Sequence, residues 1–173
     1  MANPSGLIAT FDSILKTLLD ETAASRTTLR LDSEARDWTV NDVVAEALVP
    51  GAKSFRGDRS LDQRRLSTVV WMDRERRVLI HNDCANADPP APPELRTHYG
   101  VKAQMLGPIV RDCRLMGWIS VHYVPAARTW TPAGIGALEK AVRSVHRELD
   151  AAGGSPVERR PPATPEAGLH RVS

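Results

Sequence analysis

Cysteines, aromatic residues and long apolar runs are all scarce in this sequence. The two cysteines among 173 residues, Cys84 and Cys113, are too few and too far apart for a disulfide framework or a zinc-binding spacing, so we expect reduced thiols. The formal net charge is only +2, from 23 basic and 21 acidic residues, and no basic run is interleaved with aromatic residues. The electrostatic footprint of a nucleic-acid-binding protein is therefore missing.

No apolar stretch approaches the ~20 residues that a membrane-spanning helix needs. The N-terminal residues, MANPSGLIATFDSILK, also lack the basic start, the apolar run and the small-residue cleavage site of a secretory signal. We therefore expect a protein that does not associate with membranes and that is located in the cytoplasm.

The chain length, with hydrophobic residues at 42%, is enough for one domain with a real core. We expect this domain to occupy residues 1–150. Residues 151–173 are rich in Pro, Arg and Gly and offer almost nothing to bury, which predicts a disordered tail.

Two amphipathic helices are predicted at the ends of the domain. Apolar residues recur at helical spacing from Leu7 to Leu19, and a second stripe follows the start signal Thr131-Pro132 and ends near Gly153. Between them the pattern predicts two antiparallel strands at Arg26–Asp32 and Asp42–Val49, a helix at Ser60–Asp73, a short strand at Arg77–Asp83, a Pro-rich loop or short helix, and a hairpin within Gly100–Tyr123.

The order of these elements, together with several local motifs, resembles a GAF domain over Leu7 to Leu149. The motifs are Gly100-Val101 before the fourth strand, Pro108 at the end of that strand, Gly117 at the start of the fifth, and Trp130-Thr131-Pro132 before the last helix. The resemblance implies an α+β fold: an antiparallel sheet of five to six strands, with the N- and C-terminal helices on one face and a small-molecule pocket on the other. Many GAF domains are sensory modules that dimerise through their terminal helices, so we expect a homodimer.

Alternation along the strands predicts which side chains face this pocket. In the hairpin, small and aliphatic residues such as Met105 and Ile119 share the face that suits the terminal helices, and polar residues share the other face. The residues predicted to bind the ligand are Arg30, Glu46, Gln104, Ser120 and His122 on the pocket face, Asp83 at its edge, and Tyr99, Leu106 and Trp118 as hydrophobic walls.

Burial of Arg30 and Glu46 would be costly unless each were paired or engaged with a ligand. Because a guanidinium binds a carboxylate in a bidentate manner, the set favours a small polar ligand that bears a carboxylate or an amide. The alternative is an ordinary cross-strand ion pair between Arg30 and Glu46 on a partly solvated face, with His122 and Trp118 in structural roles. Five polar side chains on one face of four strands favour the pocket.

Three specialised GAF functions lack their motifs in this chain. Bilin-binding GAF domains attach the chromophore at a Cys-x-His setting, whereas Cys84 is followed by Ala-Asn. The Asn-Lys-x-Asp motif of cyclic-nucleotide GAF domains is absent, and the loop where free methionine sulfoxide reductases carry catalytic cysteines reads HYGVKA. His81, His122, Glu46 and Asp83 are suitable metal ligands, but no short His-x-x-x-His or similar spacing fixes two of them together, so no metal or cofactor is predicted.

The leading hypothesis is therefore a stand-alone GAF-type sensor that binds a small ligand and signals through a protein partner or through dimerisation. One alternative is a GAF-fold enzyme in which His122 acts as acid or base, oriented by Glu46 or Asp83. Another is a protein-interaction module that binds no ligand because its own side chains fill the pocket. Sequence spacing alone leaves all three open.

Overall fold

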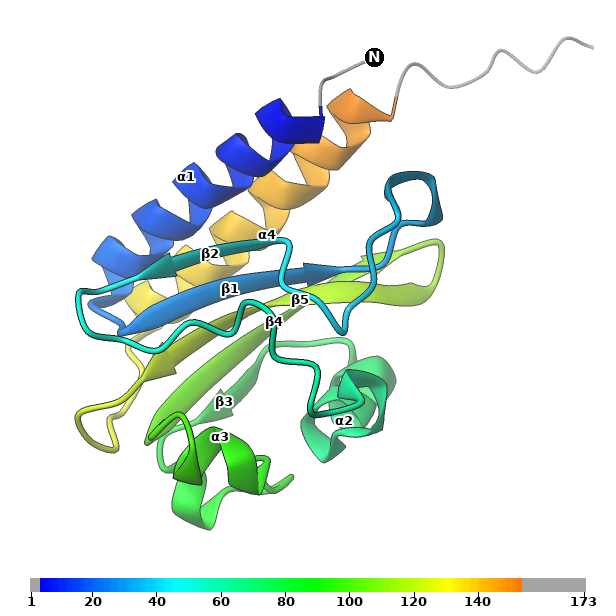
Figure 1. The fold of residues 1–173 in the computed structure, drawn as a ribbon. Helices are drawn as coiled ribbons and strands as arrows, with labels where there is room; N and C mark the ends of the chain where they lie inside the picture. The colour runs from blue at the N-terminus through cyan, green and yellow to red at the C-terminus, as the bar shows by residue number, and fades with distance from the viewer. Residues whose placement is uncertain (1–3, 154–173) are drawn as a thin grey trace, which may run out of the picture.

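The computed structural model describes residues 4–153, which form four α-helices and one five-stranded antiparallel sheet (Figure 1). The elements are α1 (Pro4–Thr22), β1 (Arg26–Leu31), the 3-10 turn η1 (Glu34–Arg36), β2 (Ala45–Leu48), η2 (Gln63–Arg65), α2 (Ser67–Glu75), β3 (Leu79–His81), η3 (Cys84–Asn86), α3 (Pro93–Thr97), β4 (Ala103–Arg111), β5 (Arg114–Tyr123) and α4 (Pro132–Ala152). The predicted α+β class and the predicted terminal helices are confirmed. The predicted tail lies outside the described residues from residue 154 onward, and residues 151 and 152 belong to α4.

The sheet has the strand order β2-β1-β5-β4-β3, and all its neighbouring strands are antiparallel. The predicted β1–β2 pair and the β4–β5 hairpin are both present. Two strands are shorter than expected: β2 begins at Ala45 because a turn occupies the residues before it, and β3 ends at His81 because the chain turns into η3. The helix predicted from Ser60 starts only at Ser67, since Leu66 before it is extended.

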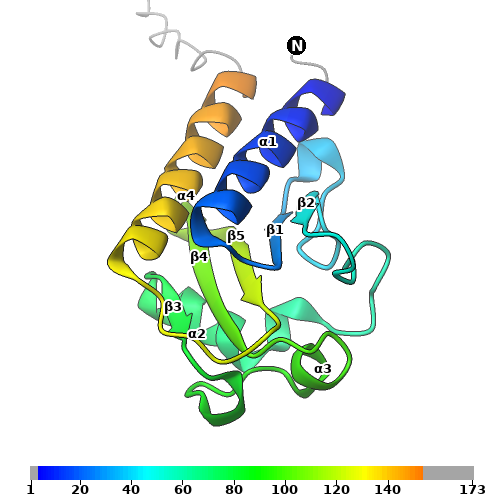
Figure 2. The same ribbon diagram turned by 90° about the vertical axis from the view of Figure 1, so that its left-hand side faces the viewer.

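Helices α1 and α4 lie side by side, antiparallel, across one face of the sheet (Figures 1 and 2). Phe11 and Leu15 on α1 are fully buried, and they belong to one core cluster with Met105 and Ile119 from the sheet. Helix α4 starts at the expected cap, because the Thr131 hydroxyl accepts a hydrogen bond from the backbone of the first turn. The main core therefore occupies the layer between the two helices and the sheet.

Two glycines in the hairpin allow close approaches that a side chain would block. A Cβ on Gly107 would lie 2.9 Å from Cγ2 of Val142, so this glycine lets α4 pack closely against β4. A Cβ on Gly117 would lie 2.0 Å from the carbonyl oxygen of Arg30. Because that oxygen belongs to the neighbouring strand β1, the backbone at Gly117 must remain free of a side chain.

The opposite face of the sheet is covered by α2, α3 and the segments that flank them (Figure 1). A second, smaller cluster of buried residues there includes Val69, Met72 and Trp118. Among the described residues, no helix combines the length and the apolar character that crossing a membrane requires. The two predicted thiols are free, with Cys84 buried and Cys113 exposed at the tip of the hairpin.

Candidate functional site

A cavity lies on the sheet face that is turned away from α1 and α4. Its floor consists of six residues from three strands: Arg30 on β1, Gln104 and Leu106 on β4, and Trp118, Ser120 and His122 on β5. Its roof consists of side chains from residues 55–69 and 92–99. The space open to the centre of a water molecule inside it is about 60 Å³.

The strand register explains why the floor residues come together. Gln104 is paired with His122, and Leu106 is paired with Ser120, across the β4–β5 hairpin. Arg30 on β1 lies opposite Trp118. Since directly paired residues project to the same face of a sheet, the alternation read from the sequence places all six floor residues on one side.

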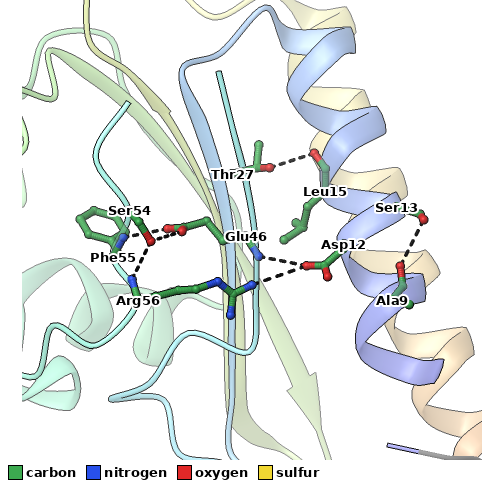
Figure 3. Close-up of polar contacts among 9 residues, drawn as sticks. All are labelled: Ala9, Asp12, Ser13, Leu15, Thr27, Glu46, Ser54, Phe55 and Arg56. Carbon is green, nitrogen blue, oxygen red and sulfur yellow. Dashed lines mark hydrogen bonds and ion pairs between the residues drawn. The ribbon is translucent and has the colours of Figure 1, made fainter. Parts of the chain in front are cut away.

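Seven of the nine residues predicted to bind the ligand line this cavity, and Glu46 and Asp83 do not. The seven are Arg30, Tyr99, Gln104, Leu106, Trp118, Ser120 and His122. The Glu46 carboxylate is taken up by the neighbouring loop, where it accepts hydrogen bonds from the Ser54 hydroxyl and the Phe55 backbone N–H (Figure 3). Asp83 caps η3 by accepting bonds from the following backbone and from Asn86. Both carboxylates therefore stabilise the backbone around the site and do not face the cavity.

Arg30 is buried, with only 6% of its surface exposed. Its Nη1 donates to the backbone oxygens of Val40 and Asn41, at 3.0 Å each. It forms no ion pair among the described residues, so the alternative of a cross-strand Arg30–Glu46 pair is wrong. Burial lowers the pKa of the guanidinium, and the negative charges of Asp42, Asp58 and Glu46 oppose that shift.

Arg26, which was not among the predicted site residues, is completely buried beside the cavity. Its Nε donates to Nδ1 of His122 at 3.1 Å, and its Nη1 donates to the backbone oxygen of Lys53 at 2.6 Å. Its guanidinium carbon lies 3.8 Å from the centre of the Phe55 ring. Burial lowers its pKa to about 10, so Arg26 remains a cation at neutral pH.

The bond from Arg26 fixes the chemical form of His122. An arginine N–H can only donate, so Nδ1 of His122 must accept and the ring proton of the neutral form sits on Nε2. Complete burial, together with the positive charges of Arg26 and Arg30, moves the pKa of His122 well below 6.5. His122 is therefore a neutral imidazole with Nε2–H as its free donor.

Gln104 links the cavity floor to a second buried histidine. Its side-chain amide nitrogen lies 3.0 Å from Nδ1 of His81 on β3. Burial lowers the pKa of His81, so this ring is also held neutral. The bond fixes the orientation of the Gln104 side chain, so the floor presents a preset arrangement of polar groups.

The roof is joined to the floor by aromatic contacts. The rings of Phe55 and Tyr99 meet edge to face at 4.2 Å, and Phe55 meets the His122 ring at 5.3 Å. The Tyr99 hydroxyl donates to Asp58. This bond, together with hydrogen bonds from Ser60, lowers the pKa of Asp58 to about 2, while burial and the Tyr99–Asp58 bond raise the pKa of Tyr99 to about 12.

The site residues that sequence reasoning missed differ in how they could have been found. Arg26 has the same strand parity as Arg30, four residues later, so extending the alternation to the first residue of β1 would have included it. Phe55 and Asp58 lie in a segment without regular structure. No periodic pattern marks such residues, because only the folded loop brings them over the sheet.

The GAF domain profile matches residues 6–149 of this chain. Three solved structures illustrate the likeness in fold. The GAF domain of the cyanobacteriochrome TePixJ is 21% identical, with a TM-score of 0.67, and the match covers 84% of this chain and 89% of that one. The chromophore-binding domain of the bacteriophytochrome RpBphP3 from R. palustris is 18% identical, with a TM-score of 0.65, and the match covers 85% of this chain and 56% of that one.

The third structure is the photoproduct state of a GAF domain from Synechocystis sp. PCC6803. It is 14% identical, with a TM-score of 0.64, and the match covers 85% of this chain and 95% of that one. At these identities the likeness concerns the fold. No curated protein sequence matches this chain.

Proposed function

Because the chain belongs to the GAF domain family, we propose that it is a sensory or regulatory protein that binds a small polar ligand in the cavity over β4 and β5. The ligand carries a carboxylate or an amide. Arg30 anchors this group, while Gln104, Ser120 and His122 set its orientation.

The observation that carries this proposal is a buried cation whose hydrogen-bond partners among the described residues are all backbone oxygens. Arg30 lines the cavity, and among the described residues it bonds only carbonyl oxygens. A buried charge that lacks a counter-ion is costly, so a fold retains one where something compensates it. A ligand carboxylate would supply the missing negative charge and accept two parallel hydrogen bonds.

The donors around Arg30 support the same ligand chemistry. His122 offers Nε2–H and cannot accept at Nδ1, because Arg26 occupies that atom. Ser120 adds a hydroxyl to the same floor. Donors that converge in a cavity of restricted volume favour a ligand group rich in acceptor atoms, as a carboxylate or an amide oxygen is.

The cavity volume supports a compact ligand. A water molecule needs about 10–15 Å³ of space measured in this way, so about 60 Å³ corresponds to a handful of waters. The solved structures of similar fold include the chromophore-binding domain of a bacteriophytochrome, but a space of about 60 Å³ favours a smaller molecule than a chromophore of that kind. Cys84 is also buried, and burial raises the pKa of its thiol to about 11, which does not favour covalent attachment.

Contacts between the roof and α1 support an output through the terminal helices. Asp12 on α1 accepts a hydrogen bond from the backbone N–H of Glu46 at 3.3 Å and lies 3.7 Å from the guanidinium of Arg56 (Figure 3). Arg56 directly follows Phe55, whose ring lines the cavity. A displacement of Phe55 by a ligand would therefore change the surroundings of α1 through neighbouring atoms.

Native mass spectrometry of gently purified protein tests the ligand. We expect a small bound mass in the wild type that is lost in Arg30→Gln. Arg143→Gln removes the same charge from an exposed position on α4 and should retain the mass. If ligand occupancy were equal in both variants, with both shown to be folded by circular dichroism, Arg30 would not be the anchor.

We also propose that α1 and α4 form a homodimer interface, with a protein partner as the other route of output. The two helices cover one face of the sheet, and their outer surfaces face away from it (Figure 2). Light scattering should give twice the monomer mass at tens of micromolar. A monomer at that concentration would leave a protein partner as the route of output.

The geometry gives less support to catalysis by His122. An acid or base must exchange a proton, but the arginine holds Nδ1 and burial disfavours the charged ring. The cytoplasmic location remains a prediction from the sequence.

A further inference from the structure

Two buried polar atoms on β1 lack any hydrogen-bond partner among the described residues. They are Nη2 of Arg26 and Oγ1 of Thr28. Arg26 is completely buried and Thr28 is 1% exposed. Buried donors are nearly always satisfied, so two orphans at neighbouring positions on one face need a physical explanation.

Both orphaned atoms lie on the sheet face that forms the cavity floor. Arg26 is paired with His122 and Thr28 with Ser120, and the two β5 residues line the cavity. Neither Arg26 nor Thr28 lines the open cavity itself. The Phe55 ring, which stacks on the Arg26 guanidinium, belongs to the roof and also lines the cavity.

Two guanidiniums approach the same Phe55 ring. Its centre lies 3.8 Å from the guanidinium carbon of Arg26 and 5.9 Å from that of Arg30. Together the two distances limit the separation of the two carbons to less than about 10 Å. A short molecule with an acidic group at each end can therefore reach both cations once the ring moves aside.

The carboxylates that face this pair of cations are already engaged. Both Glu46 oxygens are bound by the loop at residues 54 and 55, and Asp58 is bound by Tyr99 and Ser60. Asp42 is held by Arg59 in a bidentate contact. Neither Arg26 nor Arg30 forms an ion pair among the described residues, so two buried cations have no direct counter-ion.

We propose that the ligand is a short dicarboxylate, whose second carboxylate is bound beneath Phe55 by Nη2 of Arg26 and the hydroxyl of Thr28. This inference rests on the proposed function, because the first carboxylate occupies the cavity at Arg30. The second group satisfies both orphaned atoms and brings a second negative charge to a site with two positive ones. It also requires Phe55 to leave its position over Arg26, which turns ligand binding into a movement of the roof.

Calorimetric titration of the full chain with succinate and with butyrate tests this directly. The two probes have the same number of carbon atoms and differ by one carboxylate. We expect succinate to bind at least about tenfold more tightly than butyrate in the wild type, since a charge-assisted bidentate contact is among the stronger ones.

Thr28→Val is the decisive variant, because it removes only the orphaned hydroxyl and retains the branched shape. We expect it to weaken succinate binding by about fivefold or more and to leave butyrate binding unchanged. The matched control is Thr27→Val, which makes the same change at the adjacent residue on the opposite face of β1, where the hydroxyl donates to the backbone of α1. It should change neither affinity in the folded protein.

Three outcomes are distinguishable. Equal binding of succinate and butyrate, with both lost in Arg30→Gln, overturns the second subsite and leaves the proposed function in place. An equal loss of both probes in Thr28→Val also overturns it, because the hydroxyl would then act on the common carboxylate. If neither probe binds and native mass spectra show no small mass, the proposed function fails as well.

Discussion

The unpartnered hydroxyl of Thr28 predicts an unusual result: replacing this buried polar residue by valine should stabilise the empty protein. Burial of a hydroxyl without a hydrogen bond costs roughly 1–3 kcal/mol. Thr28 is 1% exposed and its Oγ1 has no partner among the described residues. Thr28→Val replaces that hydroxyl by a methyl group of similar shape on a strand, where valine is favoured. We therefore expect the free energy of unfolding to rise by about 1 kcal/mol or more.

The same substitution at the adjacent residue, Thr27→Val, should have the opposite effect on the free energy of unfolding. The Thr27 hydroxyl donates to the backbone oxygen of Leu15 at 2.8 Å (Figure 3), and this side chain is also fully buried. The variant loses one hydrogen bond and should be destabilised by about 1 kcal/mol. The two variants should thus differ by roughly 2 kcal/mol although their chemical change is the same.

Urea unfolding followed by circular dichroism measures both effects. With a slope near 2 kcal/mol per molar urea, each 1 kcal/mol moves the midpoint by about 0.5 M, upward for Thr28→Val and downward for Thr27→Val. Thermal midpoints should move in the same directions by about 2–4 °C. A lower midpoint in Thr28→Val would refute the reasoning, because the hydroxyl would then have a stabilising partner in the empty protein.

Three further results are expected. Gly117→Ala should lower the free energy of unfolding by more than about 4 kcal/mol or abolish folding, because the new Cβ would clash with the carbonyl oxygen of Arg30. A variant with near-normal thermal stability would contradict that contact. The contribution of His122 to stability is fully present above pH 6.5 and is lost as the pH falls below that value, because the ring becomes protonated in the unfolded chain while it stays neutral in the folded protein. The loss of free energy of unfolding should approach about 1.4 kcal/mol per pH unit. Urea midpoints measured from pH 7 to pH 5 should therefore fall less in a folded His122→Gln variant than in the wild type. A thiol reagent should label Cys113 rapidly in the native protein and Cys84 only in denaturant; two fast thiols would contradict the burial of Cys84.

The sequence could predict the sheet face of the site because the side-chain period of a strand is fixed at two. Once Gln104 and His122 are assigned to one hairpin face, their strand neighbours follow without knowledge of the loops. The same argument does not show where a side chain goes beyond its Cβ. Glu46 starts on the correct face, but its carboxylate turns to the neighbouring loop, where the Ser54 hydroxyl and the Phe55 backbone N–H donate to it.

Most of the roof could not be predicted in this way. Phe55 and Asp58 come from a segment with no period, and long-range contacts determine their positions, whereas Tyr99 was predicted as a wall of the pocket. The bond between Tyr99 and Asp58 joins residues that are 41 positions apart in the chain. A pattern within a short window of sequence carries no information about such a pair.

The floor of the cavity is built from strands and its roof from connecting segments, and these two parts can diverge at different rates in evolution. The floor residues sit in a register that joins β1, β5 and β4, so an insertion there would shift every neighbouring pair. The roof segments, residues 55–69 and 92–99, connect elements at the surface and can change length at little cost. Lineages can therefore be expected to retain the same acid-binding floor while the size and shape of the accepted molecule drift with the roof.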